Sequence, residues 1–130
     1  MIDELLNEAR ATYDDLSRCP CVCLKTMPKP PKNAGGVYVI YDKNDAVLYV
    51  GQAGDLYRRL HDDHLLGSGK SAFRRHLGKD PALNLHNKTD TSAWIEQNCC
   101  FKQIVIKGQK SDRLLIEHLL IYLLRPKYTG

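Results

Sequence analysis

The chain has 130 residues, of which 19 are lysine or arginine and 15 are aspartate or glutamate, so it carries a formal charge of +4 at neutral pH. That length accommodates one domain with a modest core. An apolar fraction of 43% and a charged fraction of 26% exclude an intrinsically disordered chain. The charge permits a polyanionic partner but is too small for a histone-like protein.

Neither the first residues nor the longest apolar run predicts export or membrane insertion. The opening sequence MIDELLNEAR carries acids where a secretory signal has a basic region followed by an apolar one. Residues 114–124 are too few to cross a bilayer, and they include Glu117 and His118. We therefore expect a cytoplasmic protein with no membrane partner.

The cysteines form two groups. Cys19, Cys21 and Cys23 alternate, and Cys99 and Cys100 follow much later in the chain. An odd number of cysteines without an export signal indicates reduced thiols. The CxCxC spacing also differs from the CxxC of zinc ribbons. Buried reduced thiols are therefore expected, with a structural zinc site as the alternative.

The first part of the chain predicts a helix followed by a β-hairpin. Residues 2–17 have helical spacing of apolar side chains. Residues 19–36 are rich in proline and glycine, so they are expected to be irregular. Residues 37–41 and 46–50 are rich in β-branched and aromatic side chains around a turn, which predicts an antiparallel hairpin broken off at Gly51.

The remainder predicts helices around one more strand. The expected elements are a helix over 56–66 capped by Asp55, a short helix at 71–77, a polar loop at 78–90, a helical turn at 92–97, a strand at 100–107, and an apolar helix over 112–124 capped by Ser111. The predicted fold is therefore α/β of the α+β kind, with a small antiparallel three-stranded sheet flanked by helices. Residues 1–34 are expected to form a helix and lead-in, and 35–130 the main domain.

Four residues from distant parts of the chain are candidates for chemistry. A hairpin places Tyr38 and Tyr49 on adjacent strands, and Arg59 in the following helix can reach the same place. Glu117 lies among leucines and isoleucines, where a lone carboxylate costs several kcal/mol unless it is paired or bound to a metal. Taken singly, the tyrosines could be an ordinary cross-strand pair, and Arg59 could form surface ion pairs.

These residues stand in motifs that resemble the GIY-YIG nuclease domain family. GVY at 36–38 and YVG at 49–51 correspond to the two motifs of its name. The segment YVGQAGDLYRRL is similar to the family's stretch leading to its arginine, which is Arg59 here, and EHLLIYLLRPKY resembles the family's glutamate helix. The resemblance runs from about Gly35 to Tyr128 and implies a GIY-YIG-like fold.

The resemblance also implies a chemistry. Members hydrolyse DNA phosphodiesters with one divalent ion, commonly Mg²⁺ or Mn²⁺, for which Glu117 would be the protein ligand. Arg59 would bind the scissile phosphate and offset its growing charge. Tyr38 would help to deprotonate the attacking water, and Tyr49 would orient the phosphate or the water. A tyrosine pKa near 10 requires help from the metal or from Arg59.

The sequence departs from the family pattern at three places. Relatives often have lysine after the second motif, where this chain has Gln52, and many have asparagine where Thr129 stands. Some place a histidine or tyrosine four residues after the arginine, where this chain has Asp63. His64 is one position away and His61 two, and either can enter the site as a further catalytic residue. The alternative is a plain surface position, which is the commoner one for a lone histidine on a helix.

Candidate DNA contacts share a polar or basic side chain near the predicted site: Gln52, Arg58, Lys70, Ser71, Arg74 and Arg75. GSGKS at 67–71 resembles the end of a phosphate-binding P-loop, but the first glycine of that motif falls on His64 and a helix precedes it. A flexible loop opening a helix that contacts DNA phosphates is favoured. A solvated basic face is the alternative.

The sequence therefore predicts a metal-dependent DNA endonuclease of restriction or repair type, and it leaves a homodimer open. The alternative, motivated by Gln52 and Thr129, is a nucleic-acid-binding module on the same scaffold with weak or no turnover. A further alternative is an RNA-directed nuclease.

Overall fold

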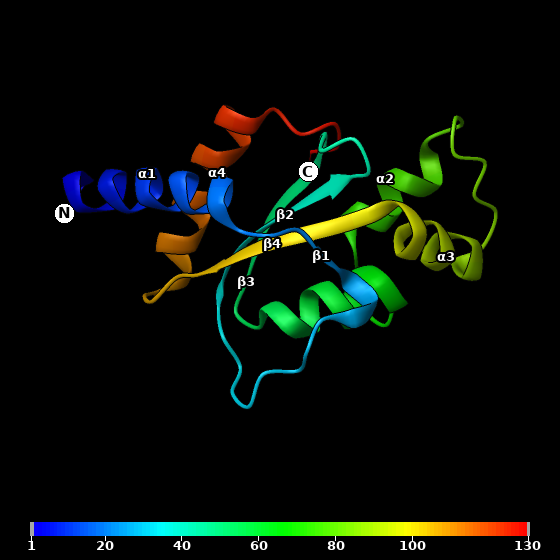
Figure 1. Ribbon diagram of the computed structural model, residues 1–130, viewed down its shortest axis with the longest axis horizontal. Coiled ribbons are helices and arrows are strands. Elements are labelled where there is room, and N and C mark those ends of the chain that lie inside the picture. Colours follow the sequence, from blue (N-terminus) through cyan, green and yellow to red (C-terminus); the bar gives the residue numbers. More distant parts are fainter. Residues whose placement is uncertain (1, 130) are drawn as a thin grey trace.

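The computed structural model describes residues 2–129 and contains a four-stranded antiparallel sheet with strand order β1-β4-β2-β3 (Figure 1). The elements in chain order are α1 (Ile2–Arg18), β1 (Val22–Cys23), η1 (Leu24–Thr26), β2 (Gly36–Asp42), β3 (Val47–Ala53), η2 (Arg58–Leu66), α2 (Ala72–Lys79), α3 (Lys88–Asn98), β4 (Cys99–Val105) and α4 (Lys110–Leu124). Figure 1 shows α1 and α4 at one end of the sheet and α2 and α3 at the other. The predicted α+β class is confirmed, with one strand more than expected.

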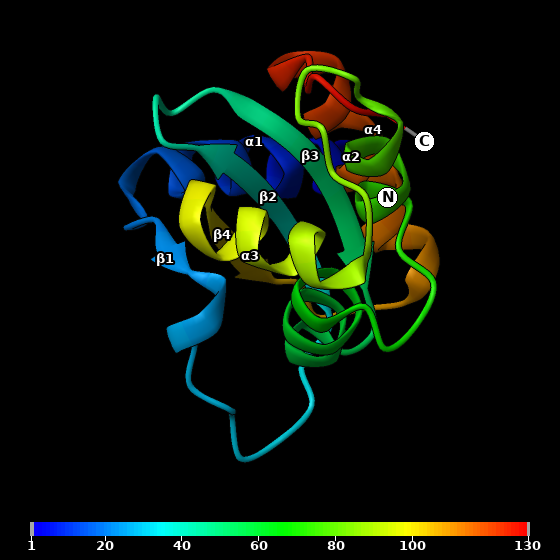
Figure 2. The ribbon, with the colours of Figure 1, turned by 90° about the vertical axis from the view of Figure 1, so that its right-hand side faces the viewer.

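β2 is buried on both faces, which explains its unbroken apolar sequence. On one face, Tyr38 and Ile40 pack in a cluster with side chains of η2, α2 and α3. On the other face, Val37 and Val39 pack in a second cluster with side chains of α1 and α4. Figure 2 shows these layers, with α3 on the near side of the sheet and α1 on the far side. The sheet thus carries a core on each face.

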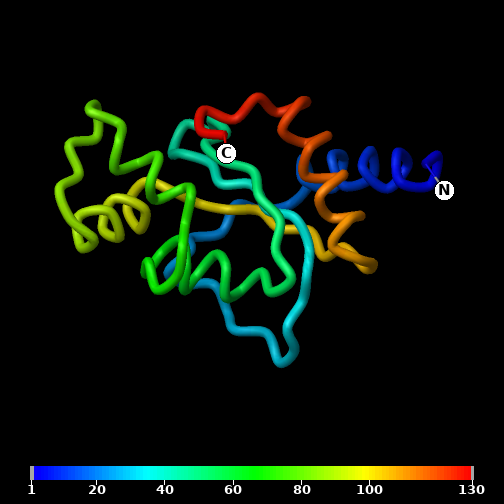
Figure 3. The backbone as a smooth tube through the Cα atoms, turned by 180° about the vertical axis from the view of Figure 1, so that it is seen from behind, coloured from blue at the N-terminus to red at the C-terminus, as the bar shows by residue number. Residues whose placement is uncertain are grey.

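β3 forms one edge of the sheet, and the segment after α4 covers the start of that edge. The backbone N–H groups of Lys127 and Tyr128 donate to the carbonyls of Val47 and Leu48 at 3.0 and 2.9 Å. Figure 3 shows the C-terminal segment returning beside the β2–β3 hairpin. The far end of the same edge, around Gln52, is left facing α4, and the candidate site lies there.

The prediction that Gly51 breaks the strand is wrong, because β3 continues to Ala53. Gly51 pairs with Tyr38 across the hairpin. A Cβ at Gly51 would overlap the Tyr38 phenol oxygen, and a Cβ at Gly36 would overlap the backbone carbonyl of Ile104. Both glycines therefore serve close packing inside the sheet.

Replacing Gly51 with alanine is expected to lower the free energy of unfolding by about 1–3 kcal/mol, because the new methyl group must displace the Tyr38 ring. Gly78→Ala is the matched control. Its Cβ would meet nothing within 4 Å, and its helical position should make it stabilising by about 0.5–1 kcal/mol. Urea unfolding measures both changes. A Gly51→Ala protein as stable as the parent would contradict this packing.

The Pro/Gly-rich segment 19–36 was expected to be irregular, and it contains a short strand instead. β1 pairs antiparallel with β4, with Cys23 opposite Cys100. This pairing brings Cys21 and Cys100, which are 79 residues apart, to a Cα–Cα distance of 5.5 Å, and they form a disulfide. The expectation of reduced thiols is therefore wrong for these two residues, because the strand pairing was not foreseen. Cys19, Cys23 and Cys99 are free.

Two helix starts also differ from prediction. α3 begins at Lys88, four residues earlier than expected, because the Asn87 side chain accepts the backbone N–H of Asp90 as an N-cap. α4 begins at Lys110 rather than after Ser111, because Gln109 and Asp112 form a reciprocal capping box. Within residues 2–129, no helix has both the length and the apolar character needed to cross a membrane.

Candidate active site

Tyr38, His64 and Ser71 form a hydrogen-bonded row inside the fold. The Tyr38 hydroxyl lies 2.6 Å from His64 Nε2, and His64 Nδ1 lies 2.7 Å from Ser71 Oγ. Ser71 caps α2, and its Oγ accepts the backbone N–H of Arg74. Tyr38 is 1% exposed and His64 0%. The row therefore connects β2, η2 and α2 through groups shielded from water.

The π-helical form of η2 explains how His64 reaches this row. In a π-helix the backbone bonds span five residues rather than four. The fifth residue after Arg59 therefore takes the face that the fourth takes in an α-helix. The structure places His64 against Tyr38, whereas Asp63, the fourth residue, binds Arg59. The one-residue offset in the sequence is thus absorbed by the helix geometry.

His61, the other histidine candidate, is not brought into the row. Its ring stacks on Tyr57 at a centroid distance of 4.9 Å, and its Nδ1 lies 2.8 Å from an Asp62 carboxylate oxygen. These partners belong to a different part of the η2 surface.

Arg59 is held at the edge of the row. One terminal nitrogen of its guanidinium donates both to Asp63 Oδ2 at 3.1 Å and to the Lys70 carbonyl at 2.8 Å. Burial and the charge of Tyr49 raise the pKa of the Tyr38 phenol, and the positive charge of Arg59 lowers it. Asp63 and the Lys70 carbonyl therefore hold the Arg59 guanidinium in place near Tyr38.

Tyr49 and Glu117 complete the cluster. The Tyr49 ring packs near the rings of Tyr38 and His64, at centroid distances of 6.4 and 5.8 Å. The Glu117 side chain, on α4, is 17% exposed. Burial raises the pKa of Glu117, while His118, a backbone hydrogen bond from Gln52 and the charge of Arg59 lower it.

The charge of Glu117 also links it to the tyrosines. It raises the pKa of both Tyr38 and Tyr49, although burial contributes more to each. The structure thus brings together the four residues that the sequence singled out: Tyr38, Tyr49, Arg59 and Glu117. His64 joins them.

At neutral pH the row contains a neutral phenol and a neutral imidazole. Burial raises the pKa of Tyr38. Burial, followed by the charges of Arg59 and Arg74, lowers the pKa of His64 to about 3. With both groups neutral, we assign the Tyr38 O–H as donor to His64 Nε2 and the Nδ1–H as donor to Ser71 Oγ, which also accepts the backbone N–H of Arg74. Tyr38 is therefore oriented to pass its proton to His64.

The lowered pKa of His64 makes a prediction for stability. A histidine of ordinary pKa 6.5 in the unfolded chain binds a proton there before it does in the folded protein. The stability that neutral His64 contributes to the folded protein is therefore fully present above pH 6.5 and is lost as the pH falls toward 3. From about pH 7.5 to about pH 5, this group alone should lower the free energy of unfolding by about 2 kcal/mol.

Urea unfolding at both pH values tests this expectation against a His64→Gln variant. The remaining titrating groups are common to both proteins, so their contributions cancel in the comparison. The parent should lose about 2 kcal/mol more than His64→Gln on acidification. An equal loss in the two proteins would show that His64 is not held neutral.

The predicted DNA contacts around α2 have different surroundings. Lys70 and Arg75 line a hollow of about 590 Å³. Arg74 lines it too, but its guanidinium donates to the carbonyls of His64, Leu65 and Lys88. Those bonds connect η2 to the start of α3, so the Arg74 guanidinium stabilises the fold and has fewer donors left for a DNA phosphate. Ser71 likewise belongs to the buried row.

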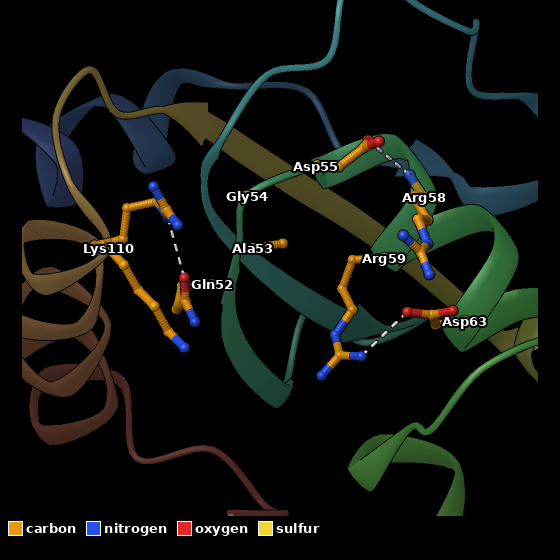
Figure 4. A pocket seen from close by; sticks show the side chains of 9 residues that line it. Gln52, Ala53, Gly54, Asp55, Arg58, Arg59, Asp63 and Lys110 are labelled. Carbon is orange, nitrogen blue, oxygen red and sulfur yellow. Dashed lines mark hydrogen bonds and ion pairs between the residues drawn. The ribbon is translucent and has the colours of Figure 1, made fainter.

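Arg58 and Gln52 lie elsewhere, in a groove of about 470 Å³ between the end of β3, η2 and α4, hereafter the β3–α4 groove. Its lining includes two residues that the sequence reasoning missed, Lys110 and Arg113. Figure 4 shows Lys110 on one side of Gln52, with Arg58 and Arg59 on the other. Lys110 and Arg113 precede Glu117 by seven and four residues on one helix, and this shared helix face is the signal that would have found them.

The matching family profile, the GIY-YIG catalytic domain, covers residues 34–129. The chain belongs to this family, as its motifs predicted. It is 33% identical over 106 residues to UvrABC system protein C of Yersinia enterocolitica, and 35% identical over 107 residues to that of Erwinia tasmaniensis. Each alignment covers 82% of this chain but 14% of the relative. The chain thus spans a small part of the length of these relatives.

One solved structure is also similar. It is the GIY-YIG N-terminal endonuclease domain of UvrC from Thermotoga maritima, a point mutant bound to its catalytic divalent cation. The TM-score is 0.44 with 23% sequence identity, over 75% of this chain and 84% of that one.

Proposed function

We propose that this chain is a metal-dependent DNA endonuclease of restriction or repair type that hydrolyses phosphodiester bonds. The single observation that carries the proposal is the buried row Tyr38–His64–Ser71, with Arg59 at the Tyr38 hydroxyl and Glu117 facing the same cluster. Membership of the GIY-YIG catalytic domain family supports the same proposal.

The donor set at Glu117 fits a hard divalent cation. Within residues 2–129, no group of three or more histidine, cysteine, aspartate or glutamate side chains could hold a metal ion. A cation at Glu117 would therefore take its other ligands from water and substrate. Mg²⁺ is commonly bound in this way, by one or two carboxylates and substrate phosphates, and Mn²⁺ accepts the same oxygen ligands. When bound, such an ion lowers the pKa of water and offsets phosphate charge.

The proton from the attacking water is proposed to leave through the row. The Tyr38 oxygen accepts that proton as its own passes to His64 Nε2, which produces hydroxide and an imidazolium ion. Burial disfavours this imidazolium in the free protein, where the pKa of His64 is lowered to about 3. A phosphodiester anion beside Arg59 would compensate the charge. Proton transfer to His64 is therefore expected to become favourable when the substrate is bound.

Arg59 is proposed to hold the scissile phosphate. Its bonds to Asp63 and to the Lys70 carbonyl are made by one terminal nitrogen. The donors on its other nitrogens remain for Tyr38 and for phosphate oxygens. A guanidinium fork matches two such oxygens and stabilises the charge that grows on them during attack. Tyr49, beside both Tyr38 and His64, would orient the phosphate or the water.

A cleavage assay tests the proposal. Linear, nicked and branched DNA are each incubated with Mg²⁺, with Mn²⁺ or with EDTA, and an RNA competitor forms a separate arm. We expect cutting with either metal and none in EDTA. Salt-sensitive binding with no cutting under any condition would overturn the nuclease proposal in favour of a binding module. If the RNA competitor suppresses DNA cutting and is itself cut in preference, the substrate is RNA rather than DNA.

A further inference from the structure

The β3–α4 groove carries more positive charge than the proposed chemistry uses. Four cations line it, namely Arg58, Arg59, Lys110 and Arg113, and of these the proposed chemistry uses Arg59. The two acids of the groove are already engaged, since Asp55 accepts the backbone N–H of Arg58 and Asp63 pairs with Arg59. Within the part of the chain that the structure describes, neither Lys110 nor Arg113 forms an ion pair.

Arg113 is held in place by an uncharged partner. Its Nε donates to Gln52 Oε1 at 3.1 Å, from α4 across to β3. Its two terminal nitrogens lie next to glycines, at 3.4 and 3.6 Å from the positions that a Cβ would take on Gly35 and Gly54. The Gln52 bond uses one donor and neutralises no charge, so the guanidinium remains available to an anion.

The position of Arg113 relative to Glu117 defines which anion it meets. Lys110, Arg113 and Glu117 follow one face of α4 at spacings of three and four residues. Four residues of α-helix separate Arg113 from Glu117 by about 6 Å along the helix axis. A strand whose scissile phosphate lies at Arg59 and Glu117 would therefore present a different phosphate to Arg113.

We propose that Arg113 and Lys110 bind a backbone phosphate next to the scissile phosphate on the same DNA strand, and that Gln52 positions the Arg113 guanidinium. The inference rests on the proposed function, because it takes the occupant of the groove to be a phosphodiester strand. This contact is independent of base sequence, as a phosphate contact is.

Fluorescence anisotropy with a labelled DNA duplex in EDTA tests the proposal without any cleavage. Arg113→Gln should weaken binding by about 5- to 10-fold at the lowest salt. It should also reduce the slope of log K against log salt by about 0.9, the value for one lost phosphate contact. Arg113→Lys, which keeps the charge, should recover most of the binding. Arg10→Gln removes the same charge from an exposed position of α1 that does not line the groove, and it should change binding by less than about twofold.

Gln52→Ala tests the positioning role. It should weaken binding in the parent, and it should add nothing in an Arg113→Gln background, because its effect passes through Arg113. Equal losses for Arg113→Gln and Arg10→Gln, or an unchanged salt slope, would overturn the inference. So would a parent protein that does not bind DNA. A parent that binds but never cleaves would overturn the proposed function alone, and the Arg113 comparison would still decide the inference.

Discussion

Replacing Glu117 with glutamine is expected to lower the metal-dependent cleavage rate by about 10³-fold or more. Loss of a metal ligand removes several kcal/mol of transition-state stabilisation, and each 1.36 kcal/mol is tenfold in rate. Within residues 2–129, no cluster of other acids or histidines could take over the metal. The measurement is the single-turnover cleavage rate on the preferred DNA substrate in Mg²⁺.

Stability and binding should separate a catalytic role of Glu117 from a structural one. Burial raises the pKa of Glu117, so its charge is already disfavoured in the folded protein. A neutral amide of the same shape should therefore leave the protein at least as stable. DNA binding in EDTA should be unchanged or tighter, because a negative charge is lost near the phosphate.

Glu8→Gln is the matched control for Glu117→Gln, since it removes a half-buried carboxylate from α1, which does not line the β3–α4 groove. This variant should cleave as fast as the parent. If Glu117→Gln also cleaves at the parent rate, the assignment of Glu117 as the metal ligand is wrong.

Much of the site could be predicted because it depends on local sequence. The unbroken apolar run of β2, the turn after it and the carboxylate within an apolar helix each point to one arrangement. Tyr38, Tyr49 and Glu117 therefore lie where the motifs place them. What the motifs cannot give is whether each polar group is already engaged in the fold. Arg74 illustrates this, since a basic residue in a loop looks like a DNA contact until its four acceptors are known.

The features that escaped prediction depend on contacts distant in sequence. The π-helical turns of η2 have no clear residue signature, so the spacing from Arg59 to His64 could not be interpreted from the chain alone. The Cys21–Cys100 disulfide required the β1–β4 pairing across 79 residues. Arg113 escaped for a similar reason, because its partner Gln52 lies 61 positions earlier.

Those distant contacts also change the meaning of two departures from the family pattern. Asp63 and Gln52 are two of the departures from the pattern that the resemblance implied, and each would count as a lost functional group if side chains were compared position by position. In the structure, His64 reaches the row in place of the residue at 63. Gln52 brings Arg113 to the end of β3, so a cation is present there after all. Both departures are therefore compatible with the proposed chemistry.

Tyr38→Phe is expected to reduce cleavage by about 10²- to 10⁴-fold, the range for losing a general acid–base group. The phenyl ring still fills the space over Gly51, so packing is kept. The hydroxyl, however, is the hydrogen-bond partner of His64 Nε2 at 2.6 Å. Its loss leaves a buried acceptor unsatisfied, which should also lower the free energy of unfolding by about 1–3 kcal/mol.

Tyr128→Phe separates these two effects, because it removes a similar bond away from the site. The Tyr128 hydroxyl donates to Asp80 Oδ2 at 2.6 Å. This variant should lose about 1 kcal/mol of stability and keep the parent cleavage rate.

A double variant that combines Tyr38→Phe and His64→Gln tests whether the two residues act on the same proton. If the two residues pass one proton, the double variant should cleave no more slowly than the slower single variant. Multiplicative losses would show that Tyr38 and His64 act independently, which would contradict the proton route through the row.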